Sequence, residues 1–218
     1  MGRGTGSFIN GCRRGTSVRN VLLGFLAGAA LLACTGASPL LTPLPGDAVL
    51  LAFGDSITYG TGAAPDESYP AVLARLTGRT VVNAGVPGET TAEGMARLPA
   101  TLETYHPALM ILCLGGNDFL RRLDERAAAD NLREMVRQAR SRGVEVVLLG
   151  VPRLGFDPSP PPFYREIARE FHIPYEGKAL KGVLLKKSLK SDFIHPNAEG
   201  YRVLAEKIAA FLKKSGAL

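Results

Sequence analysis

The sequence of 218 residues contains no tryptophan, only three cysteines and only three histidines. The cysteines stand far apart, at positions 12, 34 and 113, which excludes a disulfide-stapled scaffold and leaves no CxxC pair for zinc. Three scattered histidines likewise offer no metal site, so we expect neither a metal nor another cofactor. A hydrophobic content of 46% and a charged content of 21% exclude a disordered chain, and the length suits one globular domain.

Acidic residues are absent from the first 33 positions, which hold four arginines: Arg3, Arg13, Arg14 and Arg19. The last 13 of these positions, 21–33, carry no charge at all. A helix of that length rises about 20 Å, short of the ~30 Å hydrocarbon core of a bilayer. A basic segment, a short apolar run and small residues in that order predict a secretory signal peptide at residues 1–33.

The end of this apolar run, Leu31-Leu32-Ala33-Cys34, resembles the lipobox of bacterial lipoproteins. The resemblance implies cleavage before Cys34, a diacylglycerol on its thiol, and an exported protein anchored to a membrane at its periplasmic or cell-surface face. Two alternatives stay open: an ordinary signal peptide cut near Ala33, and a retained signal anchor. Residues 34–46 are rich in Pro, Gly and small side chains and are predicted to form a tether to a domain at 47–218.

The net charge of +6 at first suggests nucleic acid or an anionic membrane as a partner. Removing residues 1–33 takes away four of the 26 basic residues and none of the 20 acidic ones, which leaves 22 against 20, or +2. No run of Lys and Arg in the remainder exceeds two residues. We therefore expect no nucleic-acid partner, and the oligomeric state stays open.

Short apolar runs alternate with amphipathic stretches in residues 47–218, which predicts an α/β fold with a parallel sheet and helices on both sides. The predicted strands are Ala48–Phe53, Thr80–Val82, Leu109–Leu114, Val144–Leu149 and a weak Ile173–Tyr175. The predicted helices are Tyr69–Leu76, Thr91–Glu103, Arg126–Arg142, Phe163–Glu170 and Ala198–Lys213. Ligands bind such sheets at the carboxyl ends of the strands, so the segments after the strands are the ones to examine.

Residues suited to acyl transfer follow these strands. Ser56, in the Gly-Asp-Ser turn after the first strand, is the candidate nucleophile, and its own N–H is a candidate oxyanion donor. His195 has a carboxylate, Asp192, three residues earlier, and such a carboxylate can hold the ring as a base for the serine. Gly85 through its N–H and Asn117 through its side-chain amide are predicted to complete the oxyanion hole.

Four blocks in this order, Gly54–Gly60, Asn83–Gly88, Gly115-Gly116-Asn117-Asp118 and Asp192–Pro196, resemble the SGNH hydrolases of the GDSL esterase/lipase family. The stretch GMARLP at 94–99 is similar to the lysophospholipase L1-like and acyl-CoA thioesterase I-like esterases. The resemblance implies a three-layer α/β/α, flavodoxin-like fold with about five parallel strands. It also implies an esterase or thioesterase that acts through an acyl-enzyme on a small-molecule or lipid ester.

Other interpretations stay open. A carbohydrate O-deacetylase of the same family and a non-catalytic surface lipoprotein that uses the fold as a binding module are the alternatives. Asp55 and Asp118 are expected to fix loops, and Cys113 is expected to be a buried core thiol. The proline-rich segment 151–162, with Leu154 and Phe156, is either an acyl-chain wall or an ordinary crossover, and Arg121 and Arg122 either bind an acidic head group or are simply solvated.

Overall fold

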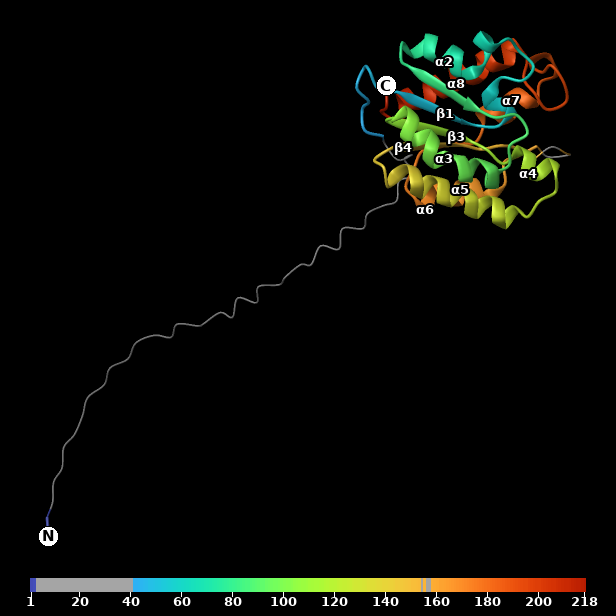
Figure 1. Ribbon diagram of the computed structural model, residues 1–218. Helices are drawn as coiled ribbons and strands as arrows, with labels where there is room; N and C mark the ends of the chain where they lie inside the picture. The colour runs from blue at the N-terminus through green and yellow to red at the C-terminus, as the bar shows by residue number, and fades with distance from the viewer. Residues whose placement is uncertain (3–40, 154, 156–157) are drawn as a thin grey trace, which may run out of the picture. The chain divides into compact units, whose positions relative to one another are not determined.

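The computed structural model describes residues 1–2, 41–153, 155 and 158–218 (Figure 1). The chain divides into two units, Met1–Thr35 and Gly36–Leu218, and all of the described helices and strands belong to the second. Residues 3–40, which include Cys34 and all but the first two residues of the predicted signal peptide, lie outside the described residues. Within the described ranges, no helix combines the length and apolarity needed to cross a membrane.

Five parallel strands form the centre of the second unit, in the order β2-β1-β3-β4-β5. Their bounds are β1 Leu50–Gly54, β2 Val81–Gly85, β3 Leu109–Cys113, β4 Glu145–Leu149 and β5 Tyr175–Glu176. Every residue of β1 and β3 is buried, as expected for strands that are apolar throughout and covered on both faces. The predicted α/β fold with about five parallel strands is confirmed.

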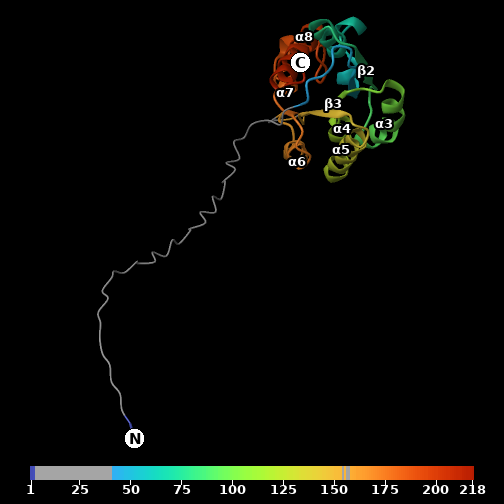
Figure 2. The same ribbon diagram turned by 90° about the vertical axis from the view of Figure 1, so that its left-hand side faces the viewer.

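Helices cover both faces of this sheet. In Figures 1 and 2, α2, α7 and α8 lie on one face and α3, α5 and α6 on the other. The α-helices are α1 Ser56–Tyr59, α2 Tyr69–Thr77, α3 Thr91–Tyr105, α4 Gly116–Leu120, α5 Glu125–Arg140, α6 Pro162–Glu170, α7 Ala179–Leu184 and α8 Ala198–Lys214. Two 3₁₀ turns, Pro65–Glu67 and Lys187–Leu189, complete the described elements.

The long helices form where the sequence pattern predicts them. In α5 the side chains of Leu132, Met135, Val136 and Ala139 are buried at helical spacing, and Asp124 caps the first turn through the N–H of Arg126. The shorter α1, α4 and α7 have four to six residues each, too few for a periodic pattern, and the sequence does not predict them.

Two boundaries differ from the predictions. Leu41 is buried, and its N–H donates to the carbonyl of Ser215, while the N–H of Leu44 donates to the carbonyl of Ala217. The structure therefore differs from the tether prediction at residues 41–44, where two backbone hydrogen bonds join the chain to the C-terminal segment. Strand β2 also extends to Gly85, because Asn83 and Gly85 pair in parallel with Ala52 and Gly54.

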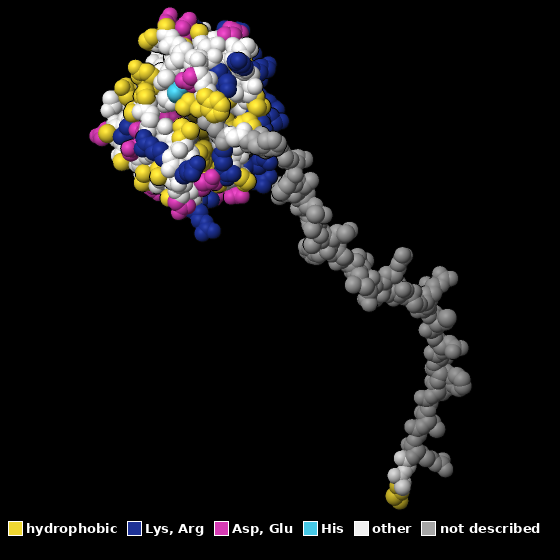
Figure 3. All heavy atoms as spheres, turned by 90° about the vertical axis from the view of Figure 1, so that its right-hand side faces the viewer, with side chains coloured by type: hydrophobic (Ala, Val, Ile, Leu, Met, Phe, Trp, Pro, Cys, Tyr) yellow, Lys and Arg dark blue, Asp and Glu magenta, His cyan; other side chains and the backbone are white. Residues whose placement is uncertain are grey.

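The carboxyl ends of β1, β2 and β3 lie at one edge of the sheet, where α1, the loop 86–90 and α4 begin. Figure 3 views the molecule from the right-hand side of Figure 1, the side on which α4 lies, and shows hydrophobic side chains interspersed with Lys and Arg. The fold therefore brings three of the four sequence blocks to one face.

Candidate active site

Ser56, His195 and Asp192 form one hydrogen-bonded chain. The Nε2 atom of His195 lies 3.0 Å from Oγ of Ser56, and its Nδ1 atom lies 2.7 Å from Oδ2 of Asp192. Ser56 is the first residue of α1, two positions after the end of β1, whereas Asp192 and His195 come from the loop before α8. This is the arrangement of a nucleophile, a base and a carboxylate that orients the base.

The loop that carries Asp192 and His195 is held mainly by contacts within itself. Oδ1 of Asp192 accepts the N–H groups of Ile194 and His195, both at 2.8 Å. Burial alone would raise the pKa of Asp192, but hydrogen bonds from the His195 ring and from these two N–H groups hold that pKa below its ordinary value. The carboxylate therefore stays charged beside the imidazole, which keeps the Nδ1–H donor toward Asp192 and Nε2 open toward Ser56.

Asp55, next to the serine, is almost fully buried and caps α1 by accepting the N–H of Ile57 at 3.0 Å. Burial raises its pKa to about 7; the Ile57 hydrogen bond opposes this rise, and the charges of Glu89 and Asp118 add to it. The predicted loop-fixing role of Asp55 agrees with this cap. Cys113, also buried, has a pKa raised well above the ordinary value by its burial, as expected for a core thiol.

Asn117 and Asp118, at the start of α4, hold the neighbouring loops. Nδ2 of Asn117 donates to the carbonyl of Glu89 at 2.9 Å, which leaves the second N–H of the amide for another acceptor. The buried Asp118 accepts both the N–H of Thr91, at 2.9 Å, and its hydroxyl, at 2.7 Å. Asp118 therefore fixes the first turn of α3 against α4, as predicted.

The structure does not support Gly85 as an oxyanion donor. Its N–H donates to Oδ1 of Asn83 at 3.0 Å and is therefore already used. The glycine is required for a different reason, because a Cβ atom at position 85 would lie 2.1 Å from the backbone nitrogen of Tyr59. This prediction is wrong: the missing side chain makes room for α1 rather than for a substrate.

A neighbouring glycine, Gly88, offers an alternative donor. The sequence places it in the Asn83–Gly88 block but assigns no oxyanion role to it. Pro87 and Gly88 form the centre of a turn closed by the N–H of Glu89 on the carbonyl of Val86, and the φ of +81° at Gly88 makes it type II. In the described part of the chain, the N–H groups of Gly88 and Ser56 have no acceptor. The Pro-Gly pair was the available signal, since it is typical of such turns.

A cavity of about 470 Å³ opens beside Ser56 and His195. Its walls are mainly apolar side chains from the start of α1, from α4 and the residues after it, from the segment after β4, from α7 and from the His195 loop. These are Ile57, Phe119, Leu120, Leu123, Val151, Leu180, Leu184 and Ile194. A cavity of this kind can hold the hydrocarbon part of a small ester.

Arginines at the rim differ in their contacts. Arg121 donates to the carbonyl of Gly88 at 2.7 Å, so it holds the turn rather than waiting for a ligand. Arg122 lines the cavity with a φ of +55°, and its guanidinium group has no ion pair or hydrogen bond within the described residues. Arg153 also lines it but is paired with Glu125 at 2.6 Å. Leu154 and Phe156, the candidates for an acyl-chain wall, lie outside the described residues.

Residues 52–203 match the GDSL-like lipase/acylhydrolase family, which is more than half of the chain. The chain belongs to this family. Its relatives include the thioesterase 1/protease 1/lysophospholipase L1 of Escherichia coli K12, which is 31% identical over 75% of this chain and 83% of the relative. Esterase TesA of Pseudomonas aeruginosa is 32% identical over 85% of this chain and 98% of the relative.

Solved structures agree with this membership. The crystal structure of TesA has a TM-score of 0.67 at 31% identity and covers 77% of this chain and 99% of its own. The SGNH-hydrolase family esterase AlinE4 has a TM-score of 0.60 at 31% identity and covers 79% of this chain and 98% of its own. The resemblance to SGNH hydrolases is therefore confirmed, and the protein is a serine hydrolase of the GDSL-like family.

Proposed function

We propose that this GDSL-like hydrolase cleaves small carboxylic esters and thioesters through an acyl-enzyme on Ser56. The observation that carries the proposal is the unbroken chain from Ser56 through His195 to Asp192, which opens into a mainly apolar cavity. The relatives named as esterase and thioesterase support the same class of reaction.

In the proposed mechanism, Oγ of Ser56 attacks the ester carbonyl while Nε2 of His195 accepts its proton. Asp192 stabilises the imidazolium through Nδ1–H, and His195 then gives the proton to the leaving alcohol or thiol. The negative charge on the carbonyl oxygen is met by the Ser56 N–H, the free N–H of the Asn117 amide and the Gly88 N–H. Water, activated by His195, then releases the acid from Ser56.

The test is hydrolysis of p-nitrophenyl acetate by Ser56→Ala, with Ser141→Ala at the exposed end of α5 as the matched serine control. We expect no burst and a loss of kcat of at least 10³-fold in the first variant, because the acyl acceptor is gone, and no change in the second. A fluorophosphonate probe should label the parent protein and the control but not Ser56→Ala. Labelled or fully active Ser56→Ala would overturn the assignment.

The substrate class is proposed from the cavity, and a panel of substrates tests it. We expect turnover of p-nitrophenyl esters, acyl-CoA and lysophospholipid to exceed that of acetylated sugars, because an apolar wall gains little from a sugar ring. Arg122→Ser should raise the KM for acyl-CoA about two- to fivefold, because it removes an ion pair between the exposed guanidinium group and a phosphate of coenzyme A, and exposed ion pairs contribute little. The KM for p-nitrophenyl acetate, which has no phosphate, should not change. Preference for acetylated sugars would favour the O-deacetylase, and no turnover would favour the binding module.

We also propose that the protein is exported and anchored through a lipid on Cys34, on the support of the sequence pattern alone. Cys34→Ala should leave an uncut precursor that takes up no radioactive palmitate in cells, whereas Cys113→Ala, which removes a buried thiol, should be lipidated normally. Unchanged processing of Cys34→Ala would point instead to an ordinary signal peptide.

A further inference from the structure

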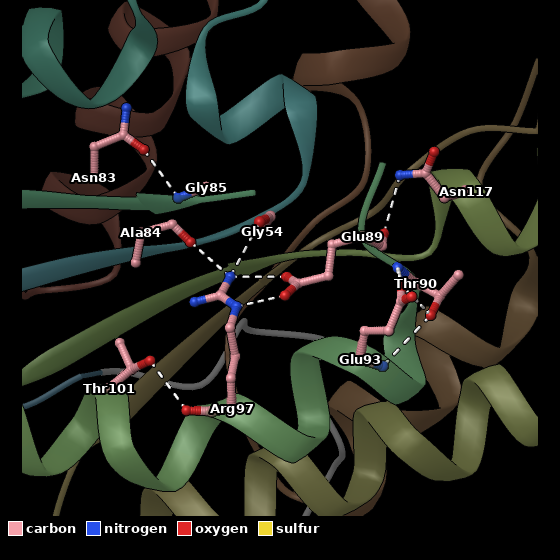
Figure 4. Close-up of polar contacts among 10 residues, drawn as sticks. All are labelled: Gly54, Asn83, Ala84, Gly85, Glu89, Thr90, Glu93, Arg97, Thr101 and Asn117. Carbon is pink, nitrogen blue, oxygen red and sulfur yellow. Dashed lines mark hydrogen bonds and ion pairs between the residues drawn. The ribbon is translucent and has the colours of Figure 1, made fainter. Parts of the chain in front are cut away.

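Arg97, from the GMARLP stretch, lies outside the catalytic chain and yet reaches the ends of two strands. Its guanidinium group makes an ion pair with the buried carboxylate of Glu89 through two nitrogens, and one of these contacts, from Nη2, is 2.7 Å long. The same Nη2 donates to the carbonyl of Ala84 at 2.8 Å and to that of Gly54 at 3.4 Å. Figure 4 shows the side chain rising from α3 to meet all three groups.

The segments that Arg97 connects are those that carry the proposed oxyanion donors. Gly54 is the last residue of β1, two positions before Ser56. Ala84 lies near the end of β2, which leads into the Gly88 turn, and Glu89 closes that turn. The carbonyl of Glu89 also accepts the amide of Asn117, so one residue joins the Arg97 pair to the third donor. Figure 4 shows Glu89 between Arg97 and Asn117.

The surroundings of Arg97 fix the plane of the guanidinium group. Its Cζ atom lies 4.0 Å from the centre of the Phe53 ring, and Phe53 is fully buried in β1. Helix α3 approaches closely at Gly94, where a Cβ atom would lie 2.6 Å from Leu114 and 3.3 Å from Oε2 of Glu89. A planar group with five N–H donors can hold the carboxylate through two nitrogens and meet the carbonyls in a fixed geometry. The single nitrogen of an ammonium group, at the end of a flexible chain, fixes no such plane.

We propose that Arg97 is a positioning residue for the oxyanion hole. By joining Glu89 to the carbonyls of Gly54 and Ala84, it fixes the Ser56 turn, the Gly88 turn and the Asn117 amide relative to one another. The proposal rests on the proposed function, because it assigns Arg97 to the same reaction. Arg97 touches neither the serine nor the cavity, so it acts through the donors that it holds in place.

The test is Arg97→Lys, with Arg133→Lys as the matched control. Arg133 also holds two acidic groups, Glu170 and Asp130, and its side chain is 24% exposed against 27% for Arg97. It belongs to α5, however, and its pair with Glu170 joins α5 to α6. We expect Arg97→Lys to lower kcat for p-nitrophenyl acetate roughly 10- to 100-fold with little change in KM, as misplaced donors weaken the transition state only. Arg133→Lys should keep the parent kcat.

A double-mutant cycle with Asn117→Ala separates positioning from general damage to the fold. If Arg97 acts through the oxyanion donors, Arg97→Lys should cost clearly less in the Asn117→Ala background than in the parent. Equal losses in both backgrounds, or an Arg97→Lys kcat within twofold of the parent, would overturn the proposal. If Arg97→Lys does not fold, Glu89→Gln takes its place in the same cycle with the same expectations, since it keeps the side-chain shape and removes the charge.

The proposed function fails in a different way. Activity that survives in Ser56→Ala would contradict the catalytic assignment whatever Arg97 does. An inactive Ser56→Ala together with a fully active Arg97→Lys would contradict only the positioning role.

Discussion

The two sides of Ser56 are built in different ways. On the acid–base side, Asp192 and His195 belong to one short loop, and the Asp192 side chain is 52% exposed. On the oxyanion side, the hydrogen-bond network that holds the proposed donors joins β1, β2, α3 and α4. The Glu89 and Asp118 side chains of this network are buried. Asp55 and Asp192 reflect this contrast, because the pKa of Asp55 is raised by burial and that of Asp192 is held low by hydrogen bonds.

This difference predicts how substitutions on each side affect activity and stability. A loop held mainly by contacts within itself can lose one of them without disturbing the rest of the domain. A buried network that spans four elements transmits the loss of one member to the others. Substitutions on the acid–base side should therefore reduce activity alone, whereas several on the oxyanion side should also reduce stability.

The largest effect is expected for Asp192→Asn. The asparagine can still accept the N–H of Ile194, but its amide favours the wrong tautomer of His195, so kcat should fall roughly 10³- to 10⁴-fold. The urea midpoint of unfolding at neutral pH should change little, because the side chain is half exposed. A large fall in stability would show that this loop is not the independent unit that the comparison describes.

Asn117→Ala should have the next largest effect on activity. Loss of one oxyanion donor typically costs about 10²- to 10³-fold in kcat, and KM should stay within about twofold. Stopped-flow measurement of the acylation step of p-nitrophenyl acetate hydrolysis checks this. Asn131→Ala is the control, because its amide donates to Thr91 and lines no part of the cavity. A change confined to KM would remove Asn117 from the oxyanion hole.

The same contrast explains which parts of the site could be predicted from the sequence. Asp192 and His195 are three residues apart, and Ser56 follows a clear strand, so local spacing was enough to find them. The contacts of Arg97 with Glu89, Gly54 and Ala84 join residues up to 43 positions apart, and no local pattern predicts such pairs. The oxyanion role predicted for Gly85 was wrong because the sequence does not distinguish a glycine needed for close packing from one needed for an open N–H.

The fold follows the same rule. Strands β1, β3 and β4 and helices α5 and α8 were predictable because their apolar patterns are long and regular. The contacts of residues 41–44 were not, because proline and small residues are typical of a tether, and only the folded chain shows that Leu41 is buried and bonded to Ser215. Burial of Leu41 depends on a partner more than 170 residues away.

Asp118→Ala should lower stability more than activity. It leaves the buried N–H and hydroxyl of Thr91 without their carboxylate acceptor, which should cost about 2–4 kcal/mol of unfolding free energy. The folded fraction should keep kcat within about tenfold, since the Asp118 side chain does not line the cavity. Urea unfolding and kcat per labelled Ser56 together separate the two effects. Asp130→Ala, an exposed carboxylate of α5, is the control.

The smallest effect on activity is expected for Asp55→Asn, whose stability should instead depend on pH. A carboxyl group with an ordinary pKa near 4 in the unfolded chain and about 7 in the folded protein keeps its proton longer in the folded state. This group's contribution to stability is therefore full at low pH and falls as pH rises from about 4 to about 7. The neutral amide removes that fall, so Asp55→Asn should gain stability relative to the parent by roughly 2–4 kcal/mol between pH 4 and pH 8.

Urea unfolding of both proteins at pH 5 and pH 8 measures this difference. Asp124→Asn is the matched control, because Asp124 also caps a helix through a backbone N–H two residues later but is exposed. The control should show the same stability difference from the parent at both pH values. If Asp55→Asn behaves in the same way, the Asp55 carboxyl is not held protonated by its burial. The contrast with the acid–base side would then rest on the burial of Glu89 and Asp118 and not on the pKa of Asp55.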